Sequence, residues 1–218
     1  MATAIELLDA AGEHGLTFRA LATKLATGPG TLYWHVANKS ELLAAATDAV
    51  LMDILNGERS DESPEDTVRS AALSIFNAID AHPWVGPQLS RNSWQSPTML
   101  HVFELIGQQL QRAGVPSDAQ FACVTALVTF ILGAGNQNAL NARVHTGSST
   151  RTEMLDAVAH EWEELDQADY PFMHDMVQTM RDHDDEEQFL AGIDMILAGA
   201  GITKATAAKR GKRVKNQK

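Results

Sequence analysis

The side chains best suited to recognising another molecule are concentrated in one short stretch. Thr31, Tyr33 and His35 can form hydrogen bonds. Trp34 presents a large aromatic face, and Lys39 adds a positive charge. Hydroxyl and imidazole groups bind phosphate oxygens, and aromatic faces or methyl groups pack against the methyl group of thymine. This group therefore favours nucleic-acid contact over catalysis. The alternative, that the two rings belong to a hydrophobic core, is weaker for Tyr33 than for Trp34.

Two short helices are predicted to position this group. Thr27 can cap a helix through its hydroxyl, and Pro29 in the first turn loses no hydrogen bond, because the first amides of a helix have no partner within it. Thr17 can cap a preceding helix, and only residues 26–28 separate the two. Two short helices joined by a tight turn, the second with exposed donors and rings, form a helix-turn-helix.

The neighbouring sequence predicts a small helical domain around this motif. Apolar residues at helical spacing indicate a first helix over residues 2–12. Asn38 followed by Glu41 is a capping-box pattern that opens a longer helix. Residues 56–64 contain a glycine, two serines and four charges, a composition typical of a domain boundary. We therefore expect a DNA-binding domain with its connecting helix over residues 1–56.

The rest of the chain also shows helical periodicity and no alternating strand pattern, so the predicted fold is all-α. We expect a larger helical domain over residues 57–202 and a basic tail over residues 203–218. Around Trp84, Pro87 and Trp94 the pattern is broken. The main helices are expected over residues 65–81, 97–113, 118–144, 153–166 and 187–199.

Residues 119–142 contain no charge and are long enough to span a bilayer. Their threonine, asparagine and glutamine residues argue against membrane insertion, and a helix buried between subunits explains the run better. The last helix is also apolar on several sides, and small residues could allow close approach between copies. These are Gly133, Gly135, Gly192 and Gly199. We expect a four-helix homodimer interface; the alternative is a central helix within a monomer.

Charge is unevenly distributed along the chain. The formal net charge is −11, yet seven of the seventeen Lys and Arg residues lie in residues 204–218, where there is no acid. This tail could bind nucleic acid nonspecifically or only aid solubility. Residues 1–56 carry three basic and six acidic side chains, a poor balance for a protein that binds phosphates. The single Cys123 excludes an internal disulfide, and no export signal opens the chain, so we expect a cytoplasmic protein.

Residues 16–22, followed by residues 31–39, resemble the DNA-binding domain of the tetracycline repressor (TetR) family. The similarity is specific over residues 4–51 and limited to the helical pattern beyond them. Within the family, the Thr-Leu-Tyr-Trp-His-Val motif is closest to the tetracycline repressor itself. The resemblance implies a homodimeric transcriptional regulator without enzymatic activity. It would most simply be a repressor that binds a palindromic double-stranded DNA operator and is released by a small effector.

The resemblance also implies DNA-binding residues. They are Arg19, Thr27, Gly28, Pro29, Gly30, Thr31, Tyr33, Trp34, His35 and Lys39. Arg19 stands at the start of the second helix, where the family carries a residue that can reach a base edge. The sequence departs from that of the tetracycline repressor at Gly28, Pro29 and Gly30, because the repressor has a longer polar side chain before its proline. Its operator is therefore a poor guide to the operator of this chain.

The larger domain should hold an apolar cavity with a few polar groups. The predicted ligand-binding residues are His82, Phe103, Thr129, Asn136 and Trp162. His82 stands at a place similar to a drug-contacting histidine of the tetracycline repressor, whereas the position of its magnesium-binding histidine is occupied by Thr129. We therefore expect a mainly apolar effector other than tetracycline with magnesium, and neither a metal nor another cofactor.

Two rival functions remain open. The first is an architectural DNA-binding protein that has no effector and relies on the basic tail. The second is a helical metalloenzyme that uses His82, His101 and nearby acids. Against it, the sequence has no His-Glu-x-x-His motif, no cysteine pair and no nucleophile motif. The acid-rich region around His174 and His183 is better explained as a solvated acidic surface.

Overall fold

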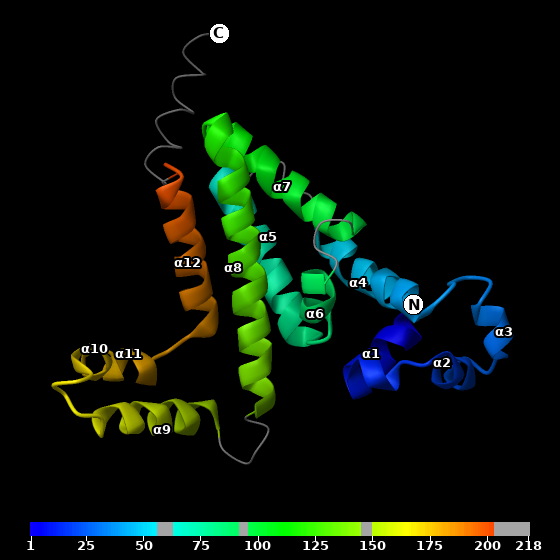
Figure 1. Ribbon diagram of the computed structural model, residues 1–218, viewed down its shortest axis with the longest axis horizontal. Coiled ribbons are helices and arrows are strands. Elements are labelled where there is room, and N and C mark those ends of the chain that lie inside the picture. The colour runs from blue at the N-terminus through cyan, green and yellow to red at the C-terminus, as the bar shows by residue number, and fades with distance from the viewer. Residues whose placement is uncertain (56–62, 92–95, 145–149, 203–218) are drawn as a thin grey trace, which may run out of the picture.

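The computed structural model describes residues 1–55, 63–91, 96–144 and 150–202, and in these ranges every regular element is a helix (Figure 1). The all-α prediction is confirmed. In chain order the helices are α1 (Ala2–Gly15), α2 (Phe18–Lys24), α3 (Pro29–Leu32), α4 (Lys39–Leu55), α5 (Pro64–Ala81), α6 (Val85–Arg91), α7 (Pro97–Ala113), α8 (Ser117–Val144), α9 (Arg151–Glu163), α10 (Pro171–Asp175), α11 (Val177–Arg181) and α12 (Asp185–Gly199).

Helices α1, α2 and α3 form a small unit, here called the head, at one end of the molecule (Figure 1). The predicted cap of α2 is present, because the Thr17 hydroxyl accepts a hydrogen bond from the backbone N–H of Ala20 at 3.0 Å. The predicted cap of α3 is wrong. Gly28 occupies that position, and the backbone N–H of Thr27 instead donates to the carbonyl of Ala22, which closes the end of α2.

Helix α3 is also shorter than the sequence pattern indicates. It ends at Leu32, and Tyr33, Trp34 and His35 continue as turns. The hydrogen bonds at this point explain the early end, because the N–H of His35 reaches back only three residues, to Leu32. The three side chains predicted to lie on the recognition helix therefore follow it directly.

Helix α4 leads from the head to the remaining helices, here called the body (α5–α12). Asn38 caps α4, since its side-chain oxygen accepts from the N–H of Glu41 at 2.9 Å, while the Glu41 carboxylate accepts from the N–H of Ala37. Buried apolar residues of head and body form one continuous cluster that includes Leu8, Leu51 and Ile79. The head is thus packed against the body rather than tethered loosely to it.

Helix α8 is the central helix of the body and packs against α5, α6, α7 and α12. By length and composition alone, its segment Ser117–Ala142 could cross a membrane. Leu127 and Ile131 lie in the core, whereas Phe121 and Leu140 are exposed. One side of α8 therefore completes the body, and other apolar side chains remain on its surface.

Two glycines expected to allow contact between subunits are used within one chain. A Cβ atom at Gly135 would lie 2.9 Å from Ile79 Cδ1, and one at Gly192 would lie 2.2 Å from Phe130 Cζ. Gly133 and Gly199 have open space around them. Only these last two are free to serve the contact that the sequence analysis assigned to all four.

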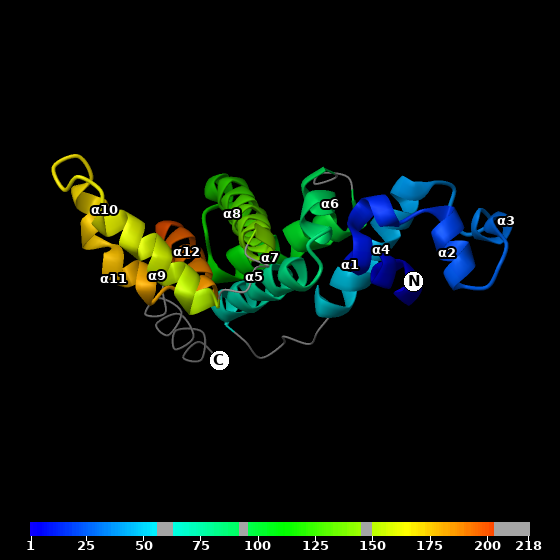
Figure 2. The same cartoon turned by 90° about the horizontal axis from the view of Figure 1, so that it is seen from below.

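Helices α9, α10 and α11 pack on one another and form an arm at the end of the molecule opposite the head (Figure 2). Thr150 and Glu153 make the capping box that starts α9. Arg151 forms an ion pair with Asp185 at 2.6 Å, which joins the arm to the start of α12.

The segment after Pro83 differs from the expected break, because residues Val85–Arg91 form the short helix α6. Trp84 before it is buried. Trp94, most of the boundary segment and the basic tail lie outside the described residues.

We predict that Gly192→Ala destabilises the protein. Phe130 stacks on Phe189, which stacks in turn on Phe76, with ring centroids 5.7 and 4.5 Å apart. A methyl group at Gly192 must displace Phe130 from this stack, and overpacking of this kind costs about 1–3 kcal/mol. Urea denaturation at fixed protein concentration measures the loss. Gly199→Ala, in open space on the same helix, is the control and should not be destabilising; equal stability of the two variants would contradict the prediction.

Candidate nucleic-acid interface and ligand cavity

The head exposes the side chains that the sequence analysis assigned to DNA. Trp34 is 89% exposed and Tyr33 57% exposed, and Thr31 and His35 are also exposed. Leu32 between them is buried and anchors the segment. The alternative that Tyr33 and Trp34 belong to a core is therefore wrong.

Tyr33 is exposed but held in place. Its ring stacks on Phe18 with a centroid distance of 4.4 Å and an interplanar angle of 13°. This contact sets the end of α3 beside the start of α2, where Arg19 follows Phe18. Arg19 is exposed at the start of the same helix. An aromatic stack of this type fixes ring orientation, so the Tyr33 hydroxyl is presented in a defined direction.

The three basic side chains of the head and of the start of α4 differ in how available they are to a binding partner. Lys24 forms an ion pair with Glu6 at 2.8 Å. Lys39 is half-buried, and its ammonium donates to the backbone carbonyl of Glu13. Arg19 is exposed and makes no ion pair within the described residues. Arg19 is thus the basic side chain most available to a phosphate or a base edge.

The remaining predicted contact residues lie in the turn before α3 and its first residues. Gly28, Pro29 and Gly30 are exposed, and Thr27 is half-buried. A Cβ atom at Gly28 or Gly30 would meet nothing within 4 Å. The turn therefore presents backbone rather than side chains to a partner.

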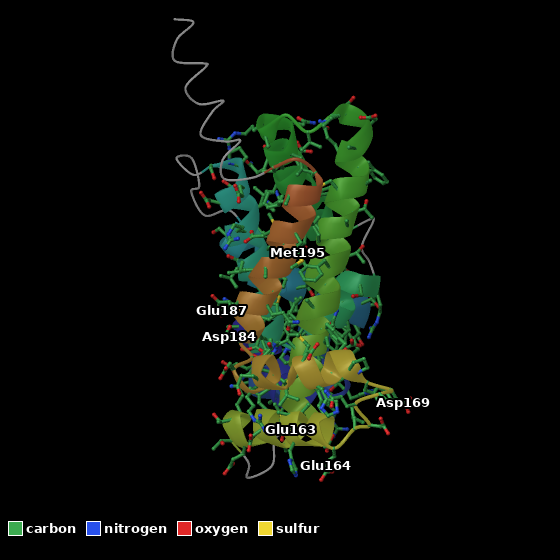
Figure 3. All side chains as sticks on the ribbon, turned by 90° about the vertical axis from the view of Figure 1, so that its left-hand side faces the viewer. Glu163, Glu164, Asp169, Asp184, Glu187 and Met195 are labelled. Carbon is green, nitrogen blue, oxygen red and sulfur yellow. The ribbon has the colours of Figure 1, made fainter. Side chains whose placement is uncertain are left out.

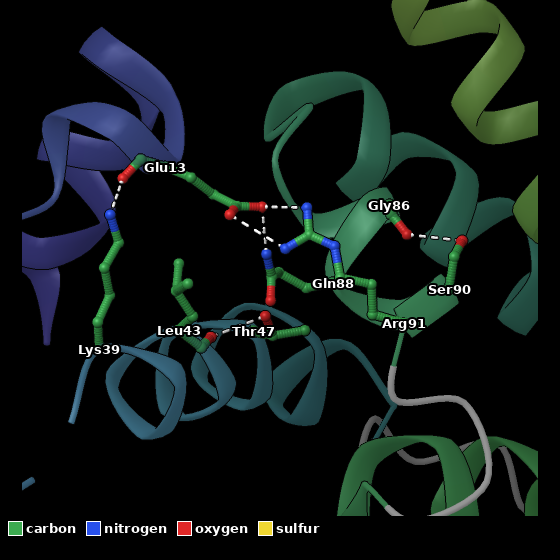
Figure 4. Close-up of polar contacts among 8 residues, drawn as sticks. All are labelled: Glu13, Lys39, Leu43, Thr47, Gly86, Gln88, Ser90 and Arg91. Carbon is green, nitrogen blue, oxygen red and sulfur yellow. Dashed lines mark hydrogen bonds and ion pairs between the residues drawn. The ribbon is translucent and has the colours of Figure 1, made fainter. Parts of the chain in front are cut away.

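A set of hydrogen bonds centred on Glu13 joins the head to the body (Figure 4). The Glu13 carboxylate accepts two hydrogen bonds from Arg91, at 2.8 and 3.1 Å, and a third from Gln88. Both donors belong to α6. The Arg91 guanidinium, assisted by Gln88, lowers the pKa of Glu13 below its ordinary value. We call this group of three residues the Glu13 clamp.

Asp9 makes a second connection between head and body, and it decides the place of His82. Its carboxylate oxygen Oδ1 accepts from Trp84 Nε1 at 2.7 Å and lies 2.7 Å from His82 Nδ1. His82 was predicted to contact a ligand in the body. The structure places it against α1 instead, which sequence reasoning missed because Asp9 is 73 residues away.

A cavity of about 310 Å³ between α6, α7 and α8 brings three of the five predicted ligand residues together. Phe103, Thr129 and Asn136 line it, whereas Trp162 lies on the arm. His82, at the end of α5, lines a separate cavity of about 560 Å³ that also involves Ile5 of α1 and Val50 of α4. The Asn136 amide donates to the Leu132 carbonyl at 2.8 Å and to the Ser90 hydroxyl at 3.4 Å. The full lining is Ser90, Phe103, Thr125, Val128, Thr129, Leu132, Gly133 and Asn136.

Larger hollows of about 500 and 400 Å³ lie at the other end of α8, beside the arm and α12. They share four lining residues, namely Asn138, Asn141, His183 and Asp185. Neither touches α6 or the head. The smaller cavity differs because it is lined by Ser90 of α6. The same helix carries Gln88 and Arg91, the donors of the Glu13 clamp.

Several acidic and histidine side chains in and beside the arm are paired with protein groups. His174 Nε2 lies 2.7 Å from the Leu165 carbonyl, and His183 Nε2 lies 3.0 Å from Asp185. Figure 3 shows Glu163 and Glu164 on the arm, and Figure 2 shows the arm at the end of the molecule opposite the head. Within the described ranges, no group of three or more His, Cys, Asp or Glu side chains could hold a metal ion.

Comparisons with known proteins agree with this geometry. Residues 1–46 match the family described as bacterial regulatory proteins, tetR family, and residues 56–204 match the tetracyclin repressor-like C-terminal domain. The chain is 30% identical to the class D tetracycline repressor protein of Escherichia coli over 208 residues, which are 90% of this chain and 84% of that protein. The chain belongs to the TetR family.

Solved structures give the same assignment. The transcriptional regulator SCO7222, a TetR from Streptomyces coelicolor, is 46% identical with a TM-score of 0.82, covering 91% of this chain and 94% of that one. BioQ with its double-stranded DNA operator is 28% identical with a TM-score of 0.57, covering 66% of this chain and 86% of that one. This TetR-family chain is therefore a DNA-binding transcriptional regulator with a ligand-binding C-terminal domain.

The Glu13 clamp predicts how the stability of this TetR-family regulator depends on pH. A carboxylate with a lowered folded pKa stabilises the folded state above its ordinary pKa near 4.5, and the contribution disappears as pH falls through the folded value. Because the pair is 57% and 26% exposed, we expect at most about 1 kcal/mol at neutral pH. Denaturation of wild type and Arg91→Ala should differ at pH 7 and converge in acid. The Glu13→Gln variant is the control, since it should lack this pH-dependent component; a difference that grows in acid would contradict the assignment.

Proposed function

We propose that the chain is a cytoplasmic, homodimeric repressor. Its two heads would bind a palindromic operator and leave it when a small, mainly apolar effector occupies the cavity between α6, α7 and α8. The observation that carries the proposal is that Trp34, Tyr33 and His35 are exposed on the head, which also exposes Arg19, a side chain with no ion pair among the described residues. Groups of this kind bind phosphates and base edges. BioQ, which is similar to this chain, has been crystallised with its double-stranded DNA operator.

Exposed apolar side chains support a dimer built on α8 and α12. Phe121 and Leu140 of α8 are exposed, and Met195 of α12 is 73% exposed (Figure 3). Burying such groups against a second copy removes apolar surface from water. A two-fold dimer can also place two recognition elements about 34–36 Å apart, the spacing of successive major grooves.

Helix α6 offers a direct path from the cavity to the head. Ser90 lines the cavity and contacts Asn136, while Gln88 and Arg91 hold Glu13 of α1. Asn136 is in tight contact with α6, because a Cβ atom at Gly86 would lie 2.0 Å from its Oδ1. A ligand that displaces Asn136 or Ser90 would shift α6 and with it α1. Helix α4, which packs on α6, would follow and change the separation of the two heads.

Substitution of the exposed head residues tests DNA binding. Arg19→Ala should weaken operator binding by about 1–3 kcal/mol and reduce the salt slope by about 1, because one charged contact is lost. Trp34→Ala should also weaken binding. Lys24→Ala should matter less, since Glu6 already neutralises Lys24. Fluorescence anisotropy with a labelled fragment of the flanking intergenic DNA, at several salt concentrations, measures all three.

His160→Ala on the arm is the matched control, because His160 is exposed and far from the head. A chain without residues 204–218 separates this proposal from an architectural role. We expect a modest, salt-dependent loss, whereas an architectural protein that relies on the tail would lose binding altogether. Unchanged affinity of both Arg19→Ala and Trp34→Ala would refute the proposed interface.

The path through α6 predicts a variant that still binds DNA but is released poorly by the effector. Arg91→Ala combined with Gln88→Ala removes the donors of the Glu13 clamp without touching the exposed head surface. With a compound that releases wild type from the operator, the double variant should need at least about fivefold more compound, the lower range of allosteric coupling. Arg112→Ala, on α7 outside the clamp, is the control. A normal response in the double variant would show that the signal bypasses Glu13.

A further inference from the structure

The lining of the cavity between α6, α7 and α8 carries information about the chemistry of its ligand. Its polar members are three hydroxyls and one amide, from Ser90, Thr125, Thr129 and Asn136. The other four members are apolar side chains and Gly133, and none of the described residues that line the cavity is ionisable. An ionised ligand would therefore lose its hydration without gaining a counter-charge.

Thr125 is the most informative of the lining residues. Its hydroxyl oxygen is buried and has no hydrogen-bond partner in the part of the chain that the structure describes. Other helical hydroxyls donate to the carbonyl four residues earlier, as Thr47 does to Leu43 and Ser74 does to Ser70. Most buried polar groups are paired in this or another way. Thr125 therefore has unused hydrogen-bonding capacity beside a cavity.

Thr129 extends this polar edge. It lies one turn after Thr125 on α8, so the two side chains share a face of the helix, about 6 Å apart along its axis. Thr129 is exposed at the cavity. Asn136 is different, because its amide N–H groups already donate to Leu132 and Ser90. The exposed Thr129 hydroxyl is thus the group most available to a ligand, and the unpaired Thr125 hydroxyl is the next, while Asn136 is committed to α6.

We infer that the effector is an uncharged, metal-free molecule with an apolar body and a carbonyl, ether or hydroxyl oxygen that pairs with the Thr125 and Thr129 hydroxyls. The inference rests on the proposed function, since it specifies the ligand of the same cavity. The volume of about 310 Å³ is at the lower end of the range for small-molecule sites. A compound of two or three rings fits this space.

The larger hollows beside the arm provide a contrast within the same chain. Their walls include Arg151, His183 and Asp185, which are ionisable and pair with one another. An ionised ligand would find charged groups there. The two regions of α8 therefore predict opposite preferences, and a matched series of ligands can separate them.

Three compounds with one skeleton provide the test: para-phenylbenzamide, para-phenylbenzoate and para-phenylbenzylammonium, which are neutral, anionic and cationic. Calorimetric titration of the full chain without DNA measures affinity, and methyl-resolved NMR of Val128 and Leu132 locates binding in the cavity. We expect the amide to bind in the cavity at least about tenfold more tightly than either ion, because neither ion meets a counter-charge there.

Variants connect this preference to the named residues. Thr125→Val and Thr129→Val together keep the side-chain shape and should lower amide affinity several-fold. Gly133→Leu should abolish cavity binding by filling open space, since a Cβ atom there meets nothing within 4 Å. Gly107→Leu, equally open on α7 but outside the lining, is the control and should bind normally. Size-exclusion chromatography of each variant checks that folding and assembly are retained.

The inference would be overturned if either ion bound in the cavity as tightly as the amide, if no compound of the series bound, or if Gly133→Leu left amide binding unchanged. Unchanged amide affinity in the variant that combines Thr125→Val and Thr129→Val would also contradict the inference. These results are independent of the proposed function, which depends on operator binding and release. A chain that binds the amide as expected but never leaves DNA would refute the switch and retain the cavity chemistry.

Discussion

The contact between Glu13 and helix α6 is the constraint on which the arrangement of head and body depends. Glu13 receives both guanidinium hydrogen bonds of Arg91 and the amide of Gln88, and its own backbone carbonyl accepts from Lys39 at the start of α4. One residue at the end of α1 therefore connects the head, α4 and α6. Two-point binding of a carboxylate by a guanidinium also fixes orientation, which a single contact would not.

Contacts of this kind also explain how the head can bind DNA although it carries more acidic than basic side chains. Within residues 1–52 every acid has a protein partner: Glu6 pairs with Lys24, Asp9 and Glu13 face the body, Glu41 caps α4 and Asp48 accepts from Thr98. These acids consequently do not confront DNA phosphates as free charges. A count of acids and bases along the sequence treats all of them as equivalent, although most are oriented by contacts inside the protein.

Local signals in the sequence predicted the long helices well. The helix over residues 97–113 was predicted with the bounds of α7, since Pro97 begins it and Gly114, in a left-handed conformation, ends it. Signals that depend on distant residues were missed. Helix α6 has only seven residues, contains the poor helix former Gly86, and is held by contacts with Asn136 and Glu13. The contact between His82 and Asp9 was missed for the same reason, because nothing near His82 in the sequence indicates Asp9.

The exposure of the residues proposed to contact DNA was predictable because it follows from local spacing. Leu32 is buried and its neighbours are not, as a short helix with one inward face requires. The exact residue at which α3 ends was not predictable, because a helix and a series of turns give the same local spacing of buried and exposed residues. The stack of Tyr33 on Phe18 was also invisible, since it joins two elements whose relative placement only the fold determines.

The composition of α8 follows from the number of surfaces that one helix must serve. Its apolar residues fill the core, yet Asn136 contacts Ser90 of α6 and Asn138 donates to Asp80 of α5. Amides can make such specific contacts without the desolvation cost of a buried charge. A helix whose residues 119–142 carry no charge but include amides and hydroxyls is therefore what a central element needs when it must pack a core, line a cavity and hold α6 in register with the head.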